Sequence, residues 1–286
     1  MASSIDHKQL RPFGIEVKCD IAAGVDDRDK GELRHLYALD GLIVIRNQQV
    51  MSMDDQLEFS AIFGPVLRKE REHYIISNVR EGGLLGNKEL LFHNDASYIS
   101  APYLGGSLHA LDAAEDATAT RFASGLRAYQ QLPRPLRERI DRLNALHVTE
   151  RATDRRTRLT DSLPSDACAV HAVVGRQRGT GRPYLFVNED LTACLIGMSD
   201  EASDKLLEEL FSYLYAEDNI YDHEWKRGDI VVWDNLALQH ARRRVSSGAR
   251  TLQRANIAEF GYWDQYPAGL KTYQDLYSSG PKWRDP

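Results

Sequence analysis

The 286-residue sequence has only three cysteines, Cys19, Cys168 and Cys194, and no Cys-x-x-Cys pair. This scarcity argues against a disulfide scaffold or a thiolate zinc site and favours a cytoplasmic location. The chain lacks any run near the roughly 18 to 20 apolar residues of a membrane span, and its start lacks the apolar segment of a signal peptide. The net charge of −6 gives no basic excess, so we expect neither a membrane nor a nucleic acid as partner.

The order of the predicted helices and strands indicates the fold class. Apolar residues recur at helical spacing over residues 29–39, 52–63, 122–142 and 199–215. Strands are expected at residues 12–17, 42–45, 74–78, 90–99, 106–111, 168–174, 184–188, 230–233 and 252–260. Because the two kinds of element do not alternate regularly, we expect a mainly β fold, with an antiparallel core and flanking helices.

The chain shows no internal repeat, low-complexity segment or linker, so we expect a single domain over residues 1–286. Residues 150–167 are strongly polar, and we interpret them as a lid-like excursion from that domain. The glycine-rich segment from Gly82 to Gly86 is a second candidate lid, although its glycines suit ordinary turns equally well.

Nine histidines are the main candidates for metal chemistry. In His93-Asn94-Asp95 a histidine and a carboxylate are two residues apart, so on a strand both point to one face. That pair alone is expected by chance, but His240 follows a predicted buried strand and supplies a second histidine. Two histidines and one carboxylate, with open positions left over, are the ligands of non-haem Fe(II) oxygenases. Ordinary core or surface positions suit the other downstream histidines better: His109, His147, His171 and His223.

Arg250 and Arg254 lie four positions apart in the strand predicted after His240, so they share one face. A guanidinium binds a carboxylate through two parallel hydrogen bonds, as a dicarboxylate co-substrate requires. A solvent-facing strand edge is the alternative. The run from Arg242 to Arg244 has two similar interpretations, attraction of anionic substrates or protection of an exposed edge.

The combined pattern resembles the taurine dioxygenase and 2,4-dichlorophenoxyacetate dioxygenase family over nearly the whole chain. Residues 42–48 and 59–65 are similar to two N-terminal motifs of that family, and residues 128–133 to its "AyeaLP" helix. The family's motifs occur here in its order: His93-x-Asp95, Trp233-Asp234-Asn235, His240, Arg250 and Arg254. The resemblance implies a double-stranded β-helix, or jelly-roll, core.

The resemblance also implies the roles of individual residues. His93, Asp95 and His240 would bind Fe(II). Arg250 would hold the distal carboxylate of 2-oxoglutarate, assisted by Thr120. The carboxylate of Asp95 disfavours halogenation, because related halogenases have a small residue there to make room for halide.

Arg254 would contact an anionic group of a small substrate. Tyr98 and Phe186 are further candidates for contact with the substrate, although ordinary core packing explains either ring as well. The sequence has no clear counterpart of the family's sulfonate-binding histidine, so taurine is not the expected substrate.

The implied reaction uses O2 and releases succinate and CO2 while it oxidises an unactivated C–H bond. Hydroxylation is the expected outcome; desaturation, cyclisation or epoxidation in natural-product biosynthesis is an alternative. An inactive jelly-roll binding protein and a zinc hydrolase are rival hypotheses of other classes. The latter would not need Arg250, and the chain lacks His-Glu-x-x-His. The resemblance further implies a homodimer or homotetramer.

Overall fold

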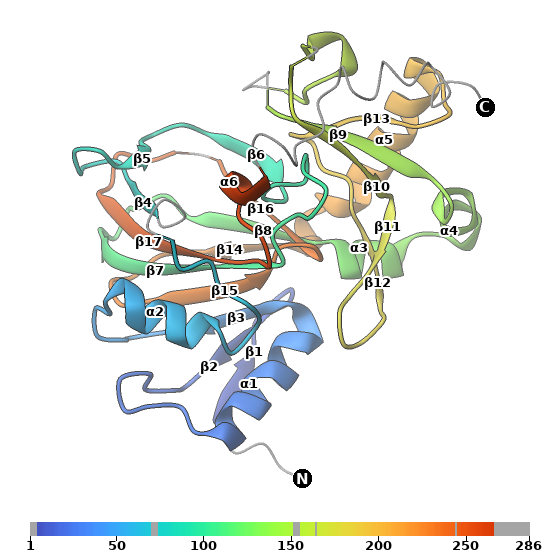
Figure 1. The fold of residues 1–286 in the computed structure, drawn as a ribbon. Coiled ribbons are helices and arrows are strands. Elements are labelled where there is room, and N and C mark those ends of the chain that lie inside the picture. The colour runs from blue at the N-terminus through green and yellow to red at the C-terminus, as the bar shows by residue number, and fades with distance from the viewer. Residues whose placement is uncertain (1–4, 70–73, 151–154, 164, 244, 266–286) are drawn as a thin grey trace.

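The computed structural model describes residues 5–69, 74–150, 155–163, 165–243 and 245–265 (Figure 1). Its major sheet has eight strands, in the spatial order β1 (His7–Gln9), β2 (Ile15–Val17), β3 (Leu42–Ile45), β15 (Ile230–Asp234), β7 (Gly105–Ala113), β17 (Arg250–Ile257), β4 (Tyr74–Ser77) and β5 (Leu84–Leu85). The minor sheet has four, in the order β14 (Ile220–His223), β8 (Thr120–Ser124), β16 (Leu238–Arg242) and β6 (Leu90–His93). All pairs are antiparallel except β2 with β3 and β4 with β5.

Two smaller sheets lie beside this core (Figure 1). One contains β10 (Cys168–Ala172), β9 (Asn144–Val148) and β13 (Thr192–Leu195), and the other pairs β11 (Val174–Arg176) with β12 (Pro183–Leu185). The helices are α1 (Asp27–Asp40), α2 (Met53–Ser60), α3 (Gly125–Gln131), α4 (Arg134–Ile140), α5 (Asp200–Leu214) and α6 (Tyr262–Gln265), with short 3₁₀ turns at Leu159–Asp161 and Glu217–Asn219. No helix among the described residues is long and apolar enough to cross a membrane.

The helices that the sequence predicts begin at residues able to cap them. Ser52 and Asp55 form a capping box at the start of α2, and the side chain of Ser199 accepts from Ala202 N at the start of α5. Gly41 ends α1 in the left-handed conformation, with φ of 74°, which glycine adopts without a steric penalty.

The structure corrects the prediction of one helix over residues 122–142. Its first part is strand β8, because pairing with β16 and β14 buries Phe122 between the sheets, and tertiary packing outweighs the local helical pattern. Pro133, which has no amide hydrogen, then separates α3 from α4. Tyr98 lies in a turn rather than on the strand expected at residues 90–99, and His147 and His223 lie on strands β9 and β14.

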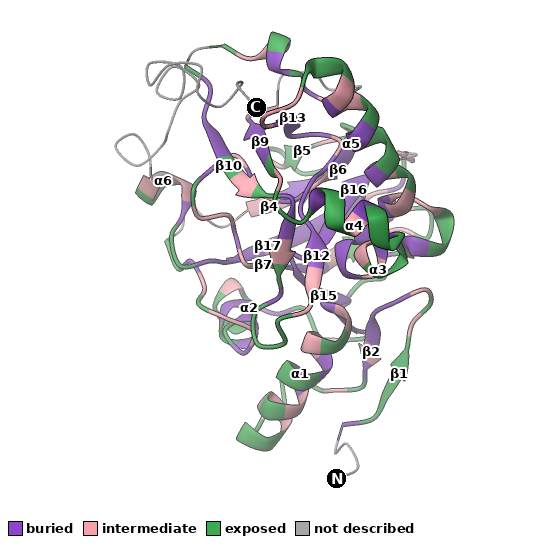
Figure 2. Ribbon diagram, turned by 90° about the vertical axis from the view of Figure 1, so that its right-hand side faces the viewer, coloured by how far each residue is buried: buried purple, intermediate pink, exposed green. Residues whose placement is uncertain are grey.

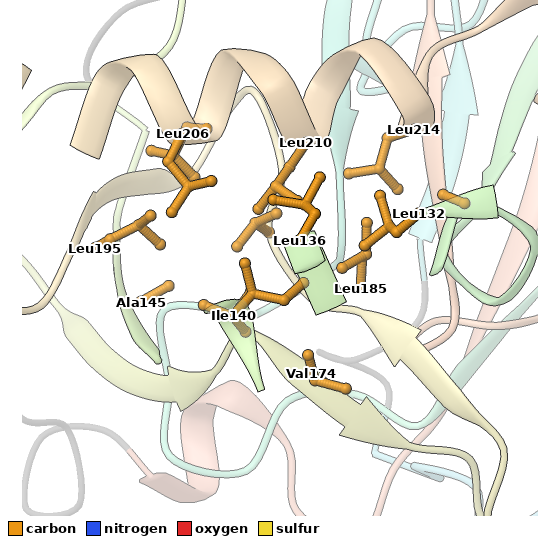
Figure 3. Packing of buried hydrophobic residues seen from close by; sticks show 14 residues of the cluster. Leu132, Leu136, Ile140, Ala145, Val174, Leu185, Leu195, Leu206, Leu210 and Leu214 are labelled. Atoms are coloured by element: carbon orange, nitrogen blue, oxygen red, sulfur yellow. The ribbon is translucent and has the colours of Figure 1, made fainter. Parts of the chain in front are cut away.

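Several apolar clusters hold the layers together, and two of them bear on the site and its flanking helices. The first lies between the major and minor sheets and includes Phe122, Trp233 and Leu252. The second packs one face of α5 against α3, α4 and the smaller sheets, through Leu206, Leu210 and their neighbours (Figure 3). Figure 2 shows that the central strands are largely buried, whereas the helices expose part of their surface. The single domain over residues 1–286 stays a prediction.

The fully buried ring of Trp233 leads to a prediction about stability. A Cβ added to Gly106 on β7 would lie 2.4 Å from that ring. We expect Gly106→Ala to lower the free energy of unfolding by about 1 to 3 kcal/mol, because the packed ring cannot move aside. Urea unfolding measures the change. Gly31→Ala, on exposed helix surface with nothing within 4 Å of the new methyl group, is the matched control and should not destabilise. Equal effects of the two substitutions would contradict the prediction.

Candidate active site

The register between β6 and β16 brings the predicted metal ligands together. His240 on β16 is directly opposite His93, the last residue of β6, and Asp95 follows in the next turn. Asp95 Oδ1 lies 3.7 Å from His93 Nε2, and its Oδ2 lies 3.6 Å from His240 Nε2. One donor atom from each of the three residues lies within 4.8 Å of the others. This is the one group of three or more such residues among the described parts of the chain.

The protonation of these residues suits a metal. His93 Nδ1 lies 2.8 Å from Leu91 O and therefore carries the hydrogen, which leaves the Nε2 lone pair facing Asp95. Burial lowers the pKa of His240 to about 3, so that ring is neutral, as a metal ligand must be. Burial alone would raise the pKa of Asp95, but Arg254 and the two histidines hold that pKa well below its usual range. The neutral imidazole of His240, the Nε2 of His93 and the carboxylate of Asp95 are therefore donor types that fit a divalent iron ion.

Two buried asparagines fix the turn that carries Asp95. Asn94 Nδ2 donates to Asn235 O at 2.6 Å and to Leu238 O at 3.1 Å. Asn235 in turn accepts from Asp95 N at 2.8 Å and donates to Asp95 O at 3.0 Å. The sequence singled out Asn235 only as part of a motif; these bonds explain its place there, because they hold the carboxylate opposite the histidines.

A cavity of about 400 Å³ opens in front of the three residues. Seven of the eight predicted site residues line it: His93, Asp95, Tyr98, Thr120, His240, Arg250 and Arg254. The remaining wall combines apolar side chains with polar residues that the sequence did not single out. These polar residues are Thr149, Glu150 and Asp190, and Arg242 from the arginine run after His240 lines the cavity with them.

Arg250 is a buried cation in the cavity wall. Its Nη1 donates to Thr118 O at 2.6 Å, and no described carboxylate lies within ion-pair distance of it. Burial, with a contribution from Arg242, lowers the pKa of Arg250 to about 9, so the guanidinium remains charged at neutral pH. Thr120 lines the same cavity, and its hydroxyl accepts from Trp225 Nε1 at 3.0 Å. The pair therefore offers an anion one charge and a hydroxyl group.

Arg254 has a different environment from Arg250. It forms an ion pair with Asp95 Oδ2, its Nε donates to Asn256 Oδ1 at 3.0 Å, and its Cζ lies 5.5 Å from the centre of the Trp233 ring. The charge of Arg254 is thus balanced by a predicted metal ligand.

Phe186 is not among the residues that line the cavity, and its environment agrees with the alternative of ordinary core packing. Its ring is buried among His147 at 5.3 Å, His171 at 5.4 Å and Tyr184 at 6.2 Å between ring centres. Tyr98 does line the cavity, in edge-on contact with Tyr262.

The structure contradicts the exposed-edge interpretation of Arg242, and attraction of anionic substrates stays a prediction. The side chain is buried and donates to three carbonyl oxygens, Leu85 O at 2.7 Å, Gly86 O at 3.0 Å and Lys88 O at 2.7 Å. It thereby fastens the segment after β5 beside the cavity. Arg243 forms an ion pair with Glu189 at 2.6 Å, and Arg244 lies outside the described residues.

Asp190 is a buried acidic residue of the cavity wall that the sequence pattern did not reveal. It lies in the turn between β12 and β13, is 5% exposed, and its Oδ1 has no hydrogen-bond partner among the described residues. Burial raises the pKa of Asp190 to about 6. The local sequence, Asn188-Glu189-Asp190, reads as an ordinary polar turn, so the only signal was three polar residues directly after an apolar run.

The raised pKa predicts how stability depends on pH. A carboxyl group whose pKa rises from 3.8 to about 6 on folding destabilises the folded protein increasingly as pH rises through that interval. Asp190→Asn removes the charge, so we expect the ligand-free variant to be more stable than the parent. That advantage should grow by about 1 kcal/mol between pH 5 and pH 8. Urea unfolding at both pH values measures it, and an advantage independent of pH would contradict this origin.

Comparisons with known proteins agree with this geometry. The chain is 29% identical to the alpha-ketoglutarate-dependent 2,4-dichlorophenoxyacetate dioxygenase of Cupriavidus pinatubonensis, over 83% of this chain and 94% of that protein. It is 28% identical to the pentalenolactone F synthase of Streptomyces avermitilis, over 84% and 89%.

Solved structures show the same fold. A taurine dioxygenase from Burkholderia xenovorans superposes with a TM-score of 0.74 at 21% identity, covering 89% of this chain and 91% of that one. The protein AAD-2, crystallised with Mn(II) and N-oxalylglycine, has a TM-score of 0.74 at 22% identity, covering 90% and 98%. These likenesses confirm the expected double-stranded β-helix.

One family model, described as taurine catabolism dioxygenase TauD, TfdA family, matches residues 6–256. The expected class of enzyme, an Fe(II)- and 2-oxoglutarate-dependent dioxygenase that uses O2, is thereby confirmed. The chain belongs to the TauD, TfdA family.

Proposed function

We propose that this dioxygenase holds Fe(II) with His93, Asp95 and His240 and oxidises an unactivated C–H bond of a small organic substrate. The observation that carries the proposal is the convergence of these three side chains at the cavity, with His93 held in the tautomer that frees its Nε2. When bound, iron, 2-oxoglutarate and O2 supply the oxidation, and 2-oxoglutarate leaves as succinate and CO2.

Arg250 is the proposed anchor for the distal carboxylate of 2-oxoglutarate, with Thr120 beside it. Both line the cavity, and Arg250 is a buried guanidinium that no described carboxylate balances. A dicarboxylate supplies the missing charge and the two parallel acceptors that a guanidinium binds best. This contact fixes the orientation of the co-substrate without involving the metal ligands.

The remaining cavity residues orient the substrate and exclude water. Leu85, Leu90, Leu108 and Leu252 form apolar walls around the charged groups. In such surroundings the target carbon meets the reactive centre without competing solvent.

An anionic substrate group stays a proposal. Relatives named for 2,4-dichlorophenoxyacetate and for (S)-phenoxypropionate support it, because those molecules carry a carboxylate. In this structure, however, Arg254 is paired with Asp95, so an anion would have to compete with that carboxylate. Hydroxylation is the proposed outcome. Relatives named pentalenolactone F synthase favour the alternative, another oxidative outcome in natural-product biosynthesis.

The remaining predictions concern the location of the protein in the cell, its oligomeric state and its lid-like segments. The three cysteines are all free thiols, which supports the proposed cytoplasmic location. The homodimer or homotetramer, the lid-like role of residues 150–167 and that of Gly82–Gly86 stay predictions. Within the former segment, residues 151–154 and 164 lie outside the described part of the chain.

The reaction class is tested by supplying Fe(II), 2-oxoglutarate and air and measuring succinate, alone and with a panel of carboxylates, sulfonates and amines. We expect succinate that depends on both iron and O2. No succinate from iron-loaded protein across the panel would favour the rival hypothesis, an inactive binding protein with the same fold.

The role of Arg250 predicts a selective defect. We expect Arg250→Ala to weaken 2-oxoglutarate binding by about 100-fold, because truncating one partner of a buried charge pair costs several kcal/mol. Binding of Mn(II) should not change, since Arg250 contacts none of the three proposed ligands. Calorimetry measures both affinities, with Arg178→Ala as the control, an exposed arginine paired with Glu259. Collapse of Mn(II) binding in Arg250→Ala would mean that the arginine is structural.

A further inference from the structure

The charged groups that line the cavity are matched within the protein, with two exceptions. Arg242 is held by three carbonyl oxygens, Arg254 by Asp95, and Glu150 by Lys88 at 2.7 Å. The two exceptions are Arg250, the proposed site for 2-oxoglutarate, and the carboxylate of Asp190. Once the co-substrate balances Arg250, Asp190 is the charge without a partner.

The position of Asp190 is built into the fold rather than set by a loose loop. Asn188 Oδ1 accepts from Leu191 N at 2.7 Å, and Thr192 Oγ1 accepts from Asn188 N at 2.8 Å, so the turn is closed on both sides of Asp190. Asp190 O also accepts from Thr157 N at 3.2 Å. The side chain is 5% exposed, yet it lines the cavity. The backbone therefore holds a buried carboxylate at the cavity wall.

A buried carboxylate without a partner destabilises a folded protein, because desolvation penalises its charge. Structural roles of acidic side chains are visible next to it and differ from this one. Glu189 accepts from Phe92 N at 3.0 Å and pairs with Arg243 at 2.6 Å. Asp190 makes no such bond through its Oδ1. An interaction with a ligand would offset its desolvation.

We propose that the substrate carries a protonated amine that pairs with Asp190. This inference rests on the proposed function, which assigns the iron and the 2-oxoglutarate to the other charged groups of the cavity. Glu150 lies in the same wall, but its charge is balanced by Lys88, so Asp190 is the carboxylate left for the ligand. An ammonium group supplies both the charge and the hydrogen-bond donors that a carboxylate requires.

The rest of the cavity defines the body of this amine. Leu90 and Leu191 line the cavity with Asp190, and Tyr98 adds an aromatic face. A total volume of about 400 Å³ that also accepts 2-oxoglutarate leaves room only for a small molecule. The substrate class is therefore a small amine on an apolar body. A carboxylate on the same molecule would make it an amino acid.

Probes that share one apolar body but carry an amine, a carboxylate or both distinguish recognition of a positive charge from recognition of a negative charge. The aromatic set is phenethylamine, 3-phenylpropanoate and L-phenylalanine, and the aliphatic set is hexylamine, hexanoate and 6-aminohexanoate. Calorimetry measures their binding to the full chain, with and without Mn(II) and N-oxalylglycine. We expect an amine-bearing member to bind more tightly than its carboxylate analogue. Asp190→Asn should weaken that amine by about 10- to 100-fold, as loss of a charged hydrogen bond does, and leave the carboxylate analogue unchanged.

Glu150→Gln is the matched control, because it neutralises a second carboxylate in the same wall whose charge Lys88 already balances. Its effect on amine affinity should stay below about 3-fold, as for an exposed ion pair. Three results would overturn the proposal: a preference for carboxylates, equal losses in both variants, or no amine bound more tightly by the parent than by Asp190→Asn. Absence of 2-oxoglutarate and N-oxalylglycine binding would instead contradict the proposed function, and amine binding without them would still decide the role of Asp190.

Discussion

The pairing of β6 with β16 is the constraint on which the site depends. It sets His93 opposite His240, and the hydrogen bonds of Asn94 and Asn235 then fix the turn that carries Asp95. A slip of one residue in this register would turn one histidine to the other face of the sheet. The packing of Trp233 between the sheets supports the same arrangement, because its ring lies 4.9 Å from that of His240. Core packing and site geometry are therefore maintained by the same residues.

A charged group in a cavity of low polarity needs a partner of opposite charge or a set of hydrogen bonds. Most charged groups in this cavity find such partners within the protein. The ion pair of Arg254 with Asp95 keeps the carboxylate ionised despite its burial. Arg250 and Asp190 are the groups whose charge the described protein leaves unmatched, one positive and one negative. Unbalanced buried charges of this kind reduce stability and are retained where a ligand completes them. On this view the two residues are the charged groups of the cavity wall that a ligand completes.

Much of the fold and the proposed metal site could be predicted from the sequence, because the signals were local or had fixed spacing. Capping residues located α2 and α5, and the His-x-Asp spacing identified the dyad without any knowledge of packing. Phe122 was assigned to a helix because its strand is determined by distant partners. The direction of Phe186 and the carbonyl contacts of Arg242 depend on how loops fold over the sheets. Asp190 gave no periodic signal, since only tertiary burial distinguishes it from any polar turn residue.

The two kinds of residue in the cavity wall come from different parts of the fold. His93, His240 and Arg250 lie on strands of the two sheets, whereas Glu150 and Asp190 lie in connections outside strands. Loops change shape and sequence at lower cost to the core than strands do. Relatives with this arrangement are therefore expected to share a reaction and to differ in substrate. The names of two relatives under 30% identical agree, since one is named for a phenoxyacetate and the other for a natural product. Arg242 links strand β16 to another part of the cavity wall, because it donates to the carbonyls of Leu85, at the end of β5, and of Gly86. The segment fastened by Arg242 therefore borders the cavity beside the strand pair whose register sets His93 opposite His240.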